Sequence, residues 1–428
     1  MKRFTEAALC HIYLDLKQSK CLTSPGIEPT VPREAQANRG QWATEPQLVQ
    51  AQSGSSAEQP DDLSRAVYGI LGIPLDVIEI GALLERIDMA VAGQAPFLLS
   101  TPNVNFLMMG RADPEFRESL LLSDLCPVDG MPLVWIARLL GVPVRGRLSG
   151  SDIFDALRAR RDRDQKLKVF LFGGSGSVAD SVAKSINAQP GGLLCVGALN
   201  PGFGSVAELS SAATLNEINT TCADLLTVFL SARKAQGWLL QNHHRIRAPF
   251  RAQFGATINV QAGVVKRAPL MVQQLGFEWL WRIKEEPYLW RRYLKDGLGL
   301  LHMCATRVVP LSTGRIWRSL VGRDQRQTLK ITQSTHMTGL TLTLSGAAIE
   351  RHIDAAITCF RAALAAQTMI VIDLSRTSAI DQRFFGLLLM LRKQLAQRGD
   401  RLTFSGMTSR TRKLFRMNGF EFLLDPTR

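Results

Sequence analysis

The chain has 428 residues, of which 46% are hydrophobic and 21% charged, a composition typical of folded globular proteins and unlike that of a globally disordered chain. No apolar run reaches the length of about 18 residues that a membrane-spanning helix needs. Lys and Arg outnumber Asp and Glu by 51 to 37, which gives a formal net charge of +14. The seven cysteines form no CxxC pair, which argues against a zinc cluster or a disulfide framework and favours a reducing cytoplasm.

Residues 1–65 are predicted to form a disordered tail. Their composition is rich in Pro, Gln, Ser and Gly and shows no apolar period, so they bury too little surface to offset the entropy of ordering. Asp15 and Lys17 interrupt the apolar residues near the start, so no signal peptide is predicted.

Residues 66–263 alternate strand-like and helix-like patterns. The clearest strands are FLLSTPNV at 97–104 and LKVFLFGG at 167–174, and LLCVGALN, DLLTVFLS and RAQFGAT add further candidates. This alternation predicts an α/β domain with a mainly parallel sheet and helices on both faces. Ligands of such sheets bind at the carboxyl ends of the strands.

Residues 264–310 are predicted to be a helical appendage in which aromatic and basic side chains alternate. Between Lys266 and Lys330 there are thirteen Lys or Arg against five Asp or Glu. A basic region of this kind attracts an anionic membrane or a nucleic acid, or it is simply a solvated face. The interleaved residues are Trp279, Trp281, Tyr288, Trp290 and Tyr293 with Arg282, Lys284, Arg291, Arg292 and Lys295.

Residues 311–334 read as a polar linker, and residues 335–428 as a second compact unit. Strand TGLTLTLSG, helix AAIERHIDAAITCFRAALAA, strand TMIVIDLSR and helix DQRFFGLLLMLRKQLAQRG follow one another, and a further strand and helix complete the unit. The pattern predicts a small α/β domain.

Four clusters in the first domain contain residues suited to chemistry: Thr101-Pro102-Asn103, Pro127-Val128-Asp129-Gly130, Arg147 to Asp152, and Phe172 to Gly176. A glycine-rich turn from strand to helix suits a diphosphate, because backbone N–H groups and the helix N-terminus favour negative charge. The turn lacks the spacing of a dinucleotide or P-loop motif, however. Taken singly, Asp129 also fits a turn or cap residue and Asn103 a strand-end residue. His243 and His244 are predicted to be surface residues.

The order and spacing of TPN, PVDG, RLSGSDIF, VFLFGG, LNPGFG and GFEWLWRIKEEPYLWRRY resemble the WecG/TagA/CpsF glycosyltransferase family over about residues 69–296. The resemblance implies a Rossmann-like domain with a C-terminal helical appendage that contacts the membrane. It also implies sugar transfer from a UDP-sugar donor to a polyprenyl-diphosphate-linked glycan acceptor. The reaction would take place on the cytoplasmic, inner face of the plasma membrane, in exopolysaccharide or cell-surface polysaccharide synthesis.

The resemblance also implies roles for individual residues. Asp129 would act as base, with Asn103 in the same pocket, because an acceptor hydroxyl needs a carboxylate within reach to take its proton. No DxD metal motif is apparent, so we expect no metal or cofactor, and cations and backbone donors would hold the departing UDP. The substrate- and nucleotide-binding residues would be Thr101, Arg147, Gly150, Ser151, Asp152, Gly173, Gly174, Lys234 and Gln236. The membrane-contacting residues would be Trp279, Trp281, Arg282, Trp290, Arg291 and Arg292.

One loop departs from the family pattern. Family members have a G-x-G-x-P-K-Q-E-type loop after the strand that corresponds to DLLTVFL. Here Lys234 is kept, but Ser231 replaces the glycine, Arg233 replaces the proline, and Ala235-Gln236 replace the Gln-Glu pair. Such replacements change the backbone that a tight loop can adopt. They predict either an altered donor specificity or a weakened or inactive relative with a STAS-dependent regulatory or scaffold role.

The C-terminal unit resembles a STAS domain through IVIDLSRTSAIDQRFFGLLLMLRKQLAQRG and RKLFRMNGFEFLL. Asp381 matches the start of the phosphorylatable loop of that family, but Gln382 and Arg383 cannot be phosphorylated. The resemblance therefore implies a protein partner bound through helix faces or sheet edges. No nucleic-acid motif accompanies the basic region, so no nucleic-acid partner is predicted.

Overall fold

The computed structural model describes residues 61–162, 165–320, 328–336, 339–366 and 369–424, all of which belong to one compact unit. The predicted tail thus lies largely outside the described residues. Its last five residues do not fit the prediction: they include the short helix η1 (Asp62–Ser64), and Asp62 and Arg65 are buried. An antiparallel hairpin of β1 (Val67–Ile70) and β2 (Ile73–Asp76) follows.

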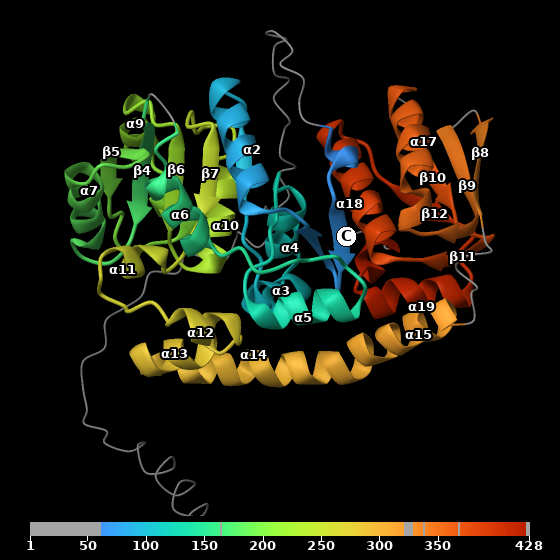
Figure 1. The fold of residues 1–428 in the computed structure, drawn as a ribbon. Helices are drawn as coiled ribbons and strands as arrows, with labels where there is room; N and C mark the ends of the chain where they lie inside the picture. Colours follow the sequence, from blue (N-terminus) through green and yellow to red (C-terminus); the bar gives the residue numbers. More distant parts are fainter. Residues whose placement is uncertain (1–60, 163–164, 321–327, 337–338, 367–368, 425–428) are drawn as a thin grey trace, which may run out of the picture. The chain divides into compact units, whose positions relative to one another are not determined.

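A five-stranded parallel sheet in the order β3-β7-β6-β4-β5 forms the centre of the first domain. β6 is buried along its whole length, because helices cover both faces of the sheet (Figure 1). Continuous apolar strands of this kind are typical of parallel sheets. The strands are β3 (Phe97–Leu99), β4 (Leu167–Gly173), β5 (Leu193–Leu199), β6 (Leu225–Phe229) and β7 (Phe250–Gln253).

Two hydrophobic cores flank this sheet, one on each face. The first contains Ile87, Phe154 and Val182, from three different helices, and the second contains Leu215 and Trp238. Helices on both faces confirm the predicted α/β architecture. The helices of the first core are α2 (Ile80–Ala92), α6 (Gly150–Ala159), α7 (Val178–Ala188) and α11 (Thr257–Gln261), and those of the second are α8 (Val206–Leu209), α9 (Ala212–Thr220) and α10 (Ala232–Gln241).

A third core joins the β1–β2 hairpin to three helices and to the appendage. Ile73 of the hairpin, Phe106 and Val134 of the helices, and Met303 of the appendage belong to it. The appendage is therefore packed on the first domain through an apolar contact. The three helices are α3 (Val104–Ala112), α4 (Pro114–Leu121) and α5 (Met131–Leu139).

The appendage contains α12 (Leu270–Gln274), α13 (Glu278–Glu285), η2 (Pro287–Leu289) and α14 (Trp290–Met303). A π-helical turn (Cys304–Val308) leads from α14 directly into α15 (Val309–Leu320), so the helix continues far beyond the predicted end (Figure 1). Of the segment 311–334, which we predicted to be a linker, residues 311–320 are helical and residues 329–334 are strand. The described residues contain no helix both long and apolar enough to cross a membrane.

The STAS-like domain is a mixed sheet in the order β11-β9-β10-β12, with β8 added beside β9. β9, β10, β11 and β12 are parallel, and β8 runs antiparallel to β9. The strands are β8 (Leu329–His336), β9 (Gly339–Ala348), β10 (Ile370–Asp373), β11 (Thr377–Ile380) and β12 (Thr403–Ser405), and the longer helices are α17 (Ile353–Ala365), α18 (Gln382–Gln397) and α19 (Ser409–Asn418).

Candidate functional site

Two predicted site segments meet beyond the end of β3. The Asp129 N–H donates to the Pro102 carbonyl oxygen at 2.9 Å, and the Ser100 N–H donates to the Leu125 carbonyl oxygen at 3.0 Å. Segment 125–129 thus runs beside segment 99–102 as an extension of the sheet edge. Gly130 then turns the chain into α5 with a φ of +89°, which side chains other than glycine rarely adopt.

Asn103 has two partners at this edge. It caps α3, where its side-chain oxygen accepts from the Phe106 N–H at 3.1 Å. The same side chain lies close enough to the Asp129 carboxylate to favour its charged form. The structure therefore brings together the two residues that were predicted as catalytic.

The surroundings of Asp129 favour its protonated form. Burial, followed by the nearby negative charge of Glu278, raises the pKa of Asp129 to about 7, although Arg147 and Asn103 oppose the shift. A carboxylate with a pKa near neutrality can take a proton and release it again under physiological conditions. The geometry and the pKa therefore suit a general base.

The start of α6 places a second carboxylate, Asp152, beside Asp129, and its pKa is shifted in the opposite direction. Ser149 and Asp152 form a capping box, in which the Ser149 N–H and hydroxyl both donate to Asp152 Oδ2, at 3.0 and 2.7 Å. Burial would raise the pKa of Asp152, but these hydrogen bonds and the charge of Arg147 outweigh it and hold the pKa below its ordinary value. The environments of Asp129 and Asp152 thus push the two pKa values apart, a pattern typical of sites that use carboxylates in different roles.

Close packing fixes the position of the α6 N-terminus at the carboxyl edge of the sheet. A side chain on Gly150 would place its Cβ 2.8 Å from the ring of Phe254, which directly follows β7. The Ser151 hydroxyl lies 3.0 Å from the hydroxyl of Thr257. Gly150 and Ser151 therefore position the helix, and its Arg147–Asp152 segment lies beside Asp129.

The appendage supplies residues that the sequence analysis missed. Arg147 Nη1 lies 3.3 Å from Glu278 and 3.3 Å from Asp152, and Arg147 also donates to Gln273. Arg267 forms ion pairs with Asp152 and Asp155. The GFEWLWR segment was assigned to the membrane alone, and the acidic residue in the first turn of its helix was the signal that could have placed Glu278 at the site.

The predicted glycine turn has a backbone that favours glycine. Gly173 and Gly174 have φ values of +104° and +93°, and a Cβ on Gly173 would lie 2.9 Å from the backbone of Phe229 on the neighbouring strand. Only glycine fits there without a backbone shift. The turn leads to the N-terminus of α7, whose N–H groups face the same edge of the sheet, as an anion site requires.

The altered segment 230–238, which we predicted to be a loop after β6, is helical from Ala232 onward. Its two predicted residues therefore lie on α10, in different surroundings. Lys234 Nζ donates to the Gly204 carbonyl oxygen at 2.7 Å, so it lies toward the end of β5. Gln236 is completely buried and hydrogen-bonds to Ser100 in both directions, at 2.9 and 3.2 Å. Because Gln236 and Thr101 are buried, they stabilise the segments that carry the site and do not line its surface. Direct contact of Lys234 with a nucleotide stays a prediction.

The predicted membrane residues divide into two groups. Trp279 and Trp290 are exposed, and Arg291 and Arg292 stack over Trp290 and Tyr293. Trp281 instead donates its indole N–H to the Lys266 carbonyl oxygen, and Arg282 forms an ion pair with Glu286 at 3.0 Å. Trp281 and Arg282 therefore also stabilise the appendage itself.

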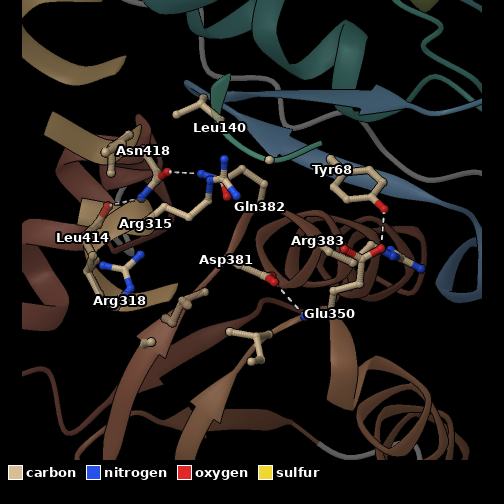
Figure 2. Close-up of a pocket in the computed structure, with 15 residues that line it drawn as sticks. Tyr68, Leu140, Arg315, Arg318, Glu350, Asp381, Gln382, Arg383, Leu414 and Asn418 are labelled. Atoms are coloured by element: carbon tan, nitrogen blue, oxygen red, sulfur yellow. Dashed lines mark hydrogen bonds between the residues drawn. The ribbon is translucent and has the colours of Figure 1, made fainter. Parts of the chain in front are cut away.

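The STAS-like loop at Asp381 lies against the first domain. Asp381 caps α18 by accepting from the Phe384 N–H and also accepts from the Glu350 N–H, at 2.9 and 2.7 Å, and burial raises its pKa to about 6. Asp381 lines a cavity of about 230 Å³. Figure 2 shows the Tyr68 hydroxyl donating to Glu350 at the edge of this cavity. The loop thus borders a junction between domains.

No group of three His, Cys, Asp or Glu within the described ranges could hold a metal ion.

Residues 68–312 match the model of the glycosyl transferase WecG/TagA/CpsF family, and residues 331–425 match that of the Mlab, STAS domain. The chain belongs to the WecG/TagA/CpsF glycosyltransferase family, as the motifs predicted. It is similar to the N-acetylglucosaminyldiphosphoundecaprenol N-acetyl-beta-D-mannosaminyltransferase of Bacillus spizizenii, with 25% identity over 195 residues that cover 46% of this chain and 73% of that protein. The enzyme of the same name from Bacillus subtilis is 24% identical over 197 residues, 46% of this chain and 75% of its own length.

Proposed function

We propose that this protein transfers a sugar from a UDP-sugar to a polyprenyl-diphosphate-linked sugar in the synthesis of a bacterial exopolysaccharide or other cell-surface polysaccharide. The observation that carries the proposal is the meeting of Asp129, Asn103 and Arg147 at the carboxyl edge of the sheet in a glycosyltransferase family member. The names of the two Bacillus relatives describe transfer to an acceptor of this class.

In the proposed reaction, Asp129 takes the proton of the acceptor hydroxyl. The hydroxyl oxygen forms a bond to the anomeric carbon of the donor, while the bond from that carbon to the diphosphate breaks and UDP leaves with the electron pair. Asn103 orients the Asp129 carboxylate, and the burial that raises its pKa keeps the base close to the working pH. The proton on Asp129 then passes to solvent.

The leaving UDP needs positive partners, because its charge grows as the bond breaks. The N-terminus of α7, which follows the Gly173-Gly174 turn, offers backbone N–H donors. Lys234 lies in the first turn of α10, just after β6, and is the nearby cation that the family pattern assigns to this role. Arg147 is already shared among Asp152, Glu278 and Gln273, so its role is to hold the site together.

A lipid-linked acceptor requires the enzyme to work at a membrane surface, and the appendage offers a suitable face. Along α14 and α15 a row of apolar side chains recurs mostly at helical spacing, and each is between 49% and 78% exposed. We call these residues the apolar stripe: Trp290, Leu294, Leu298, Leu301, Val309, Ile316, Trp317 and Leu320.

Basic side chains accompany the apolar stripe, including Arg291 and Arg292. Aromatic rings favour the headgroup level of a bilayer, and each cation near an anionic surface adds about 1 kcal/mol of attraction. The stripe continues past the predicted membrane segment into α15. We propose that it docks on the inner face of the plasma membrane and brings the site within reach of the acceptor.

The altered sequence of residues 230–238 supports one alternative function, a relative with weakened transfer that acts as a scaffold. An assay of UDP release from UDP-N-acetylhexosamine in the presence of an undecaprenyl-diphosphate-linked N-acetylglucosamine distinguishes the transferase from the scaffold. Acceptor-dependent UDP release that Asp129→Asn abolishes supports the transferase. Absence of both UDP binding and UDP release in the full chain would favour the scaffold.

A further inference from the structure

Helix α18 of the STAS-like domain is buried between its own sheet and the first domain. The hydrophobic core of the STAS-like domain includes Leu63, Val67 and Leu121 of the first domain, so the two domains share one continuous core. β1 packs along α18. This face of α18 is therefore already covered by the same chain and is not open to a protein partner.

The contact is close enough to require glycine on both sides. A Cβ on Gly386 would lie 2.0 Å from the Val67 carbonyl oxygen, and one on Gly69 would lie 2.7 Å from Phe385. Arg383, which replaces a phosphorylatable residue of the STAS pattern, donates to the same Val67 oxygen at 3.0 Å. In Figure 2 it lies beside Tyr68 and Glu350, which are themselves hydrogen-bonded.

A second contact places a buried charge of α18 inside the first domain. Lys393 is 3% exposed, and its ammonium lies 3.1 Å from Asp62 and 2.7 Å from Asp124. Burial would raise the pKa of Asp62, but Lys393 and Arg65 outweigh it and hold the pKa below its ordinary value. A buried charge is costly without partners, so Lys393 and its carboxylates hold one another in place.

The carboxylates of this cluster in turn hold the two segments that carry the candidate base and its partner. Asp124 Oδ2 accepts from the Leu98 N–H at 2.8 Å, five residues before Asn103. Lys393 also donates to the Ser123 carbonyl oxygen at 3.4 Å. Segments 98–103 and 124–129 are therefore both tied to the charge of Lys393.

The Ser123 hydroxyl extends the connection to Gln236 of α10. The Ser123 hydroxyl lies 2.7 Å from the hydroxyl of Ser100, and Ser100 bonds to the buried Gln236. A continuous set of contacts thus runs from α18 to the edge that carries Asn103 and Asp129. Groups held in this way fix the geometry that a reaction needs.

We propose that Lys393 is a positioning residue for the transferase site, and that the STAS-like domain is a fixed structural part of the enzyme that holds the catalytic segments from behind. The proposal rests on the proposed function for its catalytic consequence, but the positioning itself can be measured without activity. It predicts that the geometry of the segments that carry Asn103 and Asp129 depends on Lys393, although no atom of that residue lies at the reacting centre.

The experiment compares the full-length wild type with Lys393→Met, Lys393→Arg and Arg392→Met. Arg392 is the matched control, because it neighbours Lys393 on α18 and forms a more exposed ion pair with Glu118 at 2.8 Å. We expect Lys393→Met to lower kcat about 10- to 100-fold with KM changed less than about threefold. Lys393→Arg should restore most of the rate, and Arg392→Met should leave it unchanged.

Hydrogen–deuterium exchange supplies a readout that does not need activity. In Lys393→Met, the amides of Leu98 and Asp129 should exchange faster than in the wild type, whereas amides of β5 should not change. The acid limb of the pH–rate profile should also move to lower pH, because a displaced Asp129 loses the burial that raises its pKa. If Lys393→Met does not fold, Asp124→Asn tests the same connection, because it keeps an acceptor for Leu98 but loses the charge that faces Lys393.

The outcomes separate the two proposals. Faster exchange at Leu98 and Asp129 in a protein without transferase activity would support the positioning role and contradict the proposed function. An active enzyme in which the tested variant, Lys393→Met or its substitute Asp124→Asn, keeps wild-type rate and exchange would support the function and overturn the positioning role.

Discussion

Arg147 and Glu278 form an ion pair of 3.3 Å that joins the first domain to the appendage beside Asp129. The two residues are 131 positions apart in the sequence. Because Arg147 lowers and Glu278 raises the pKa of Asp129, the pair connects the packing of the appendage to the proton affinity of the candidate base. This connection leads to a first prediction.

Glu278→Gln should lower the pKa of Asp129, because it removes a negative charge that disfavours the carboxylate. The acid limb of the transfer-rate profile, expected near pH 7 in the wild type, should move to lower pH. Rates measured from pH 5 to 9 test this. Glu285→Gln is the control, since Glu285 lies on the same helix and is not among the groups that shift Asp129. Identical profiles for all three proteins would contradict the electrostatic connection.

Asp129→Asn should stabilise the folded protein at alkaline pH. The folded state keeps the proton on Asp129 up to about pH 7, whereas the unfolded chain loses it near pH 4, so this group costs stability as the pH rises between those values. The amide avoids that cost. We expect a gain of roughly 1–3 kcal/mol in the free energy of unfolding at pH 8 and little change at pH 4.

Denaturant unfolding of both proteins at the two pH values measures the effect. A stability difference that does not depend on pH would mean that the carboxylate is not held in an unfavourable environment.

Lys234→Ala should weaken UDP binding if this residue holds the diphosphate. Loss of one charged contact typically costs about 1.5–3 kcal/mol, or roughly 10- to 100-fold in affinity. Calorimetry with UDP provides the measurement. Arg233→Ala is the control on the same turn of α10, because Arg233 is exposed and pairs with Asp113. Equal affinities for all three proteins would show that this turn does not contact the nucleotide.

Replacing Leu294, Leu298 and Leu301 by serine should abolish sedimentation with anionic liposomes. These three residues lie on the apolar stripe, and binding strength scales with the apolar area buried in the interface. A matched control replaces Met89, Leu139 and Phe203, which are similarly exposed but lie outside the stripe. Loss of binding in the control alone would place the membrane surface elsewhere.

The electrostatic part of membrane binding calls for a separate variant. Arg291→Glu with Arg292→Glu should weaken liposome binding more at low salt than at high salt, because screening reduces the attraction of the wild type as well. The liposomes contain phosphatidylglycerol and phosphatidylcholine. Equal binding by the wild type and the variant at low salt would contradict this part.

Much of the first domain could be predicted from local patterns. The run LKVFLFGG predicts a buried strand that stops at a glycine pair, and the structure has β4 ending at Gly173, with positive φ at Gly173 and Gly174. Asn103 and Asp129 were predicted to share a pocket, and they lie in contact because both follow segments at the carboxyl edge.

Other features depend on contacts between distant parts of the chain, which no local pattern reveals. Gln236 was predicted to bind nucleotide but is buried against Ser100. Lys393 follows the buried Phe385 and Leu389 at helical spacing, and its charge is accommodated there because Asp62 and Asp124 of another domain pair with it. The polar composition of residues 311–320 concealed α15, whose arginines alternate with Ile316, Trp317 and Leu320 along an amphipathic helix.

The most direct test of the account is the rate of sugar transfer by Asp129→Asn, measured with UDP-N-acetylhexosamine and the lipid-linked acceptor beside calorimetric UDP affinity. We expect the rate to fall about 10²- to 10⁴-fold, because the amide cannot take the acceptor proton. UDP affinity should stay within about twofold, since a general base does not hold the nucleotide. An Asp129→Asn protein that transfers sugar at the wild-type rate would contradict the assignment of Asp129 as the catalytic base.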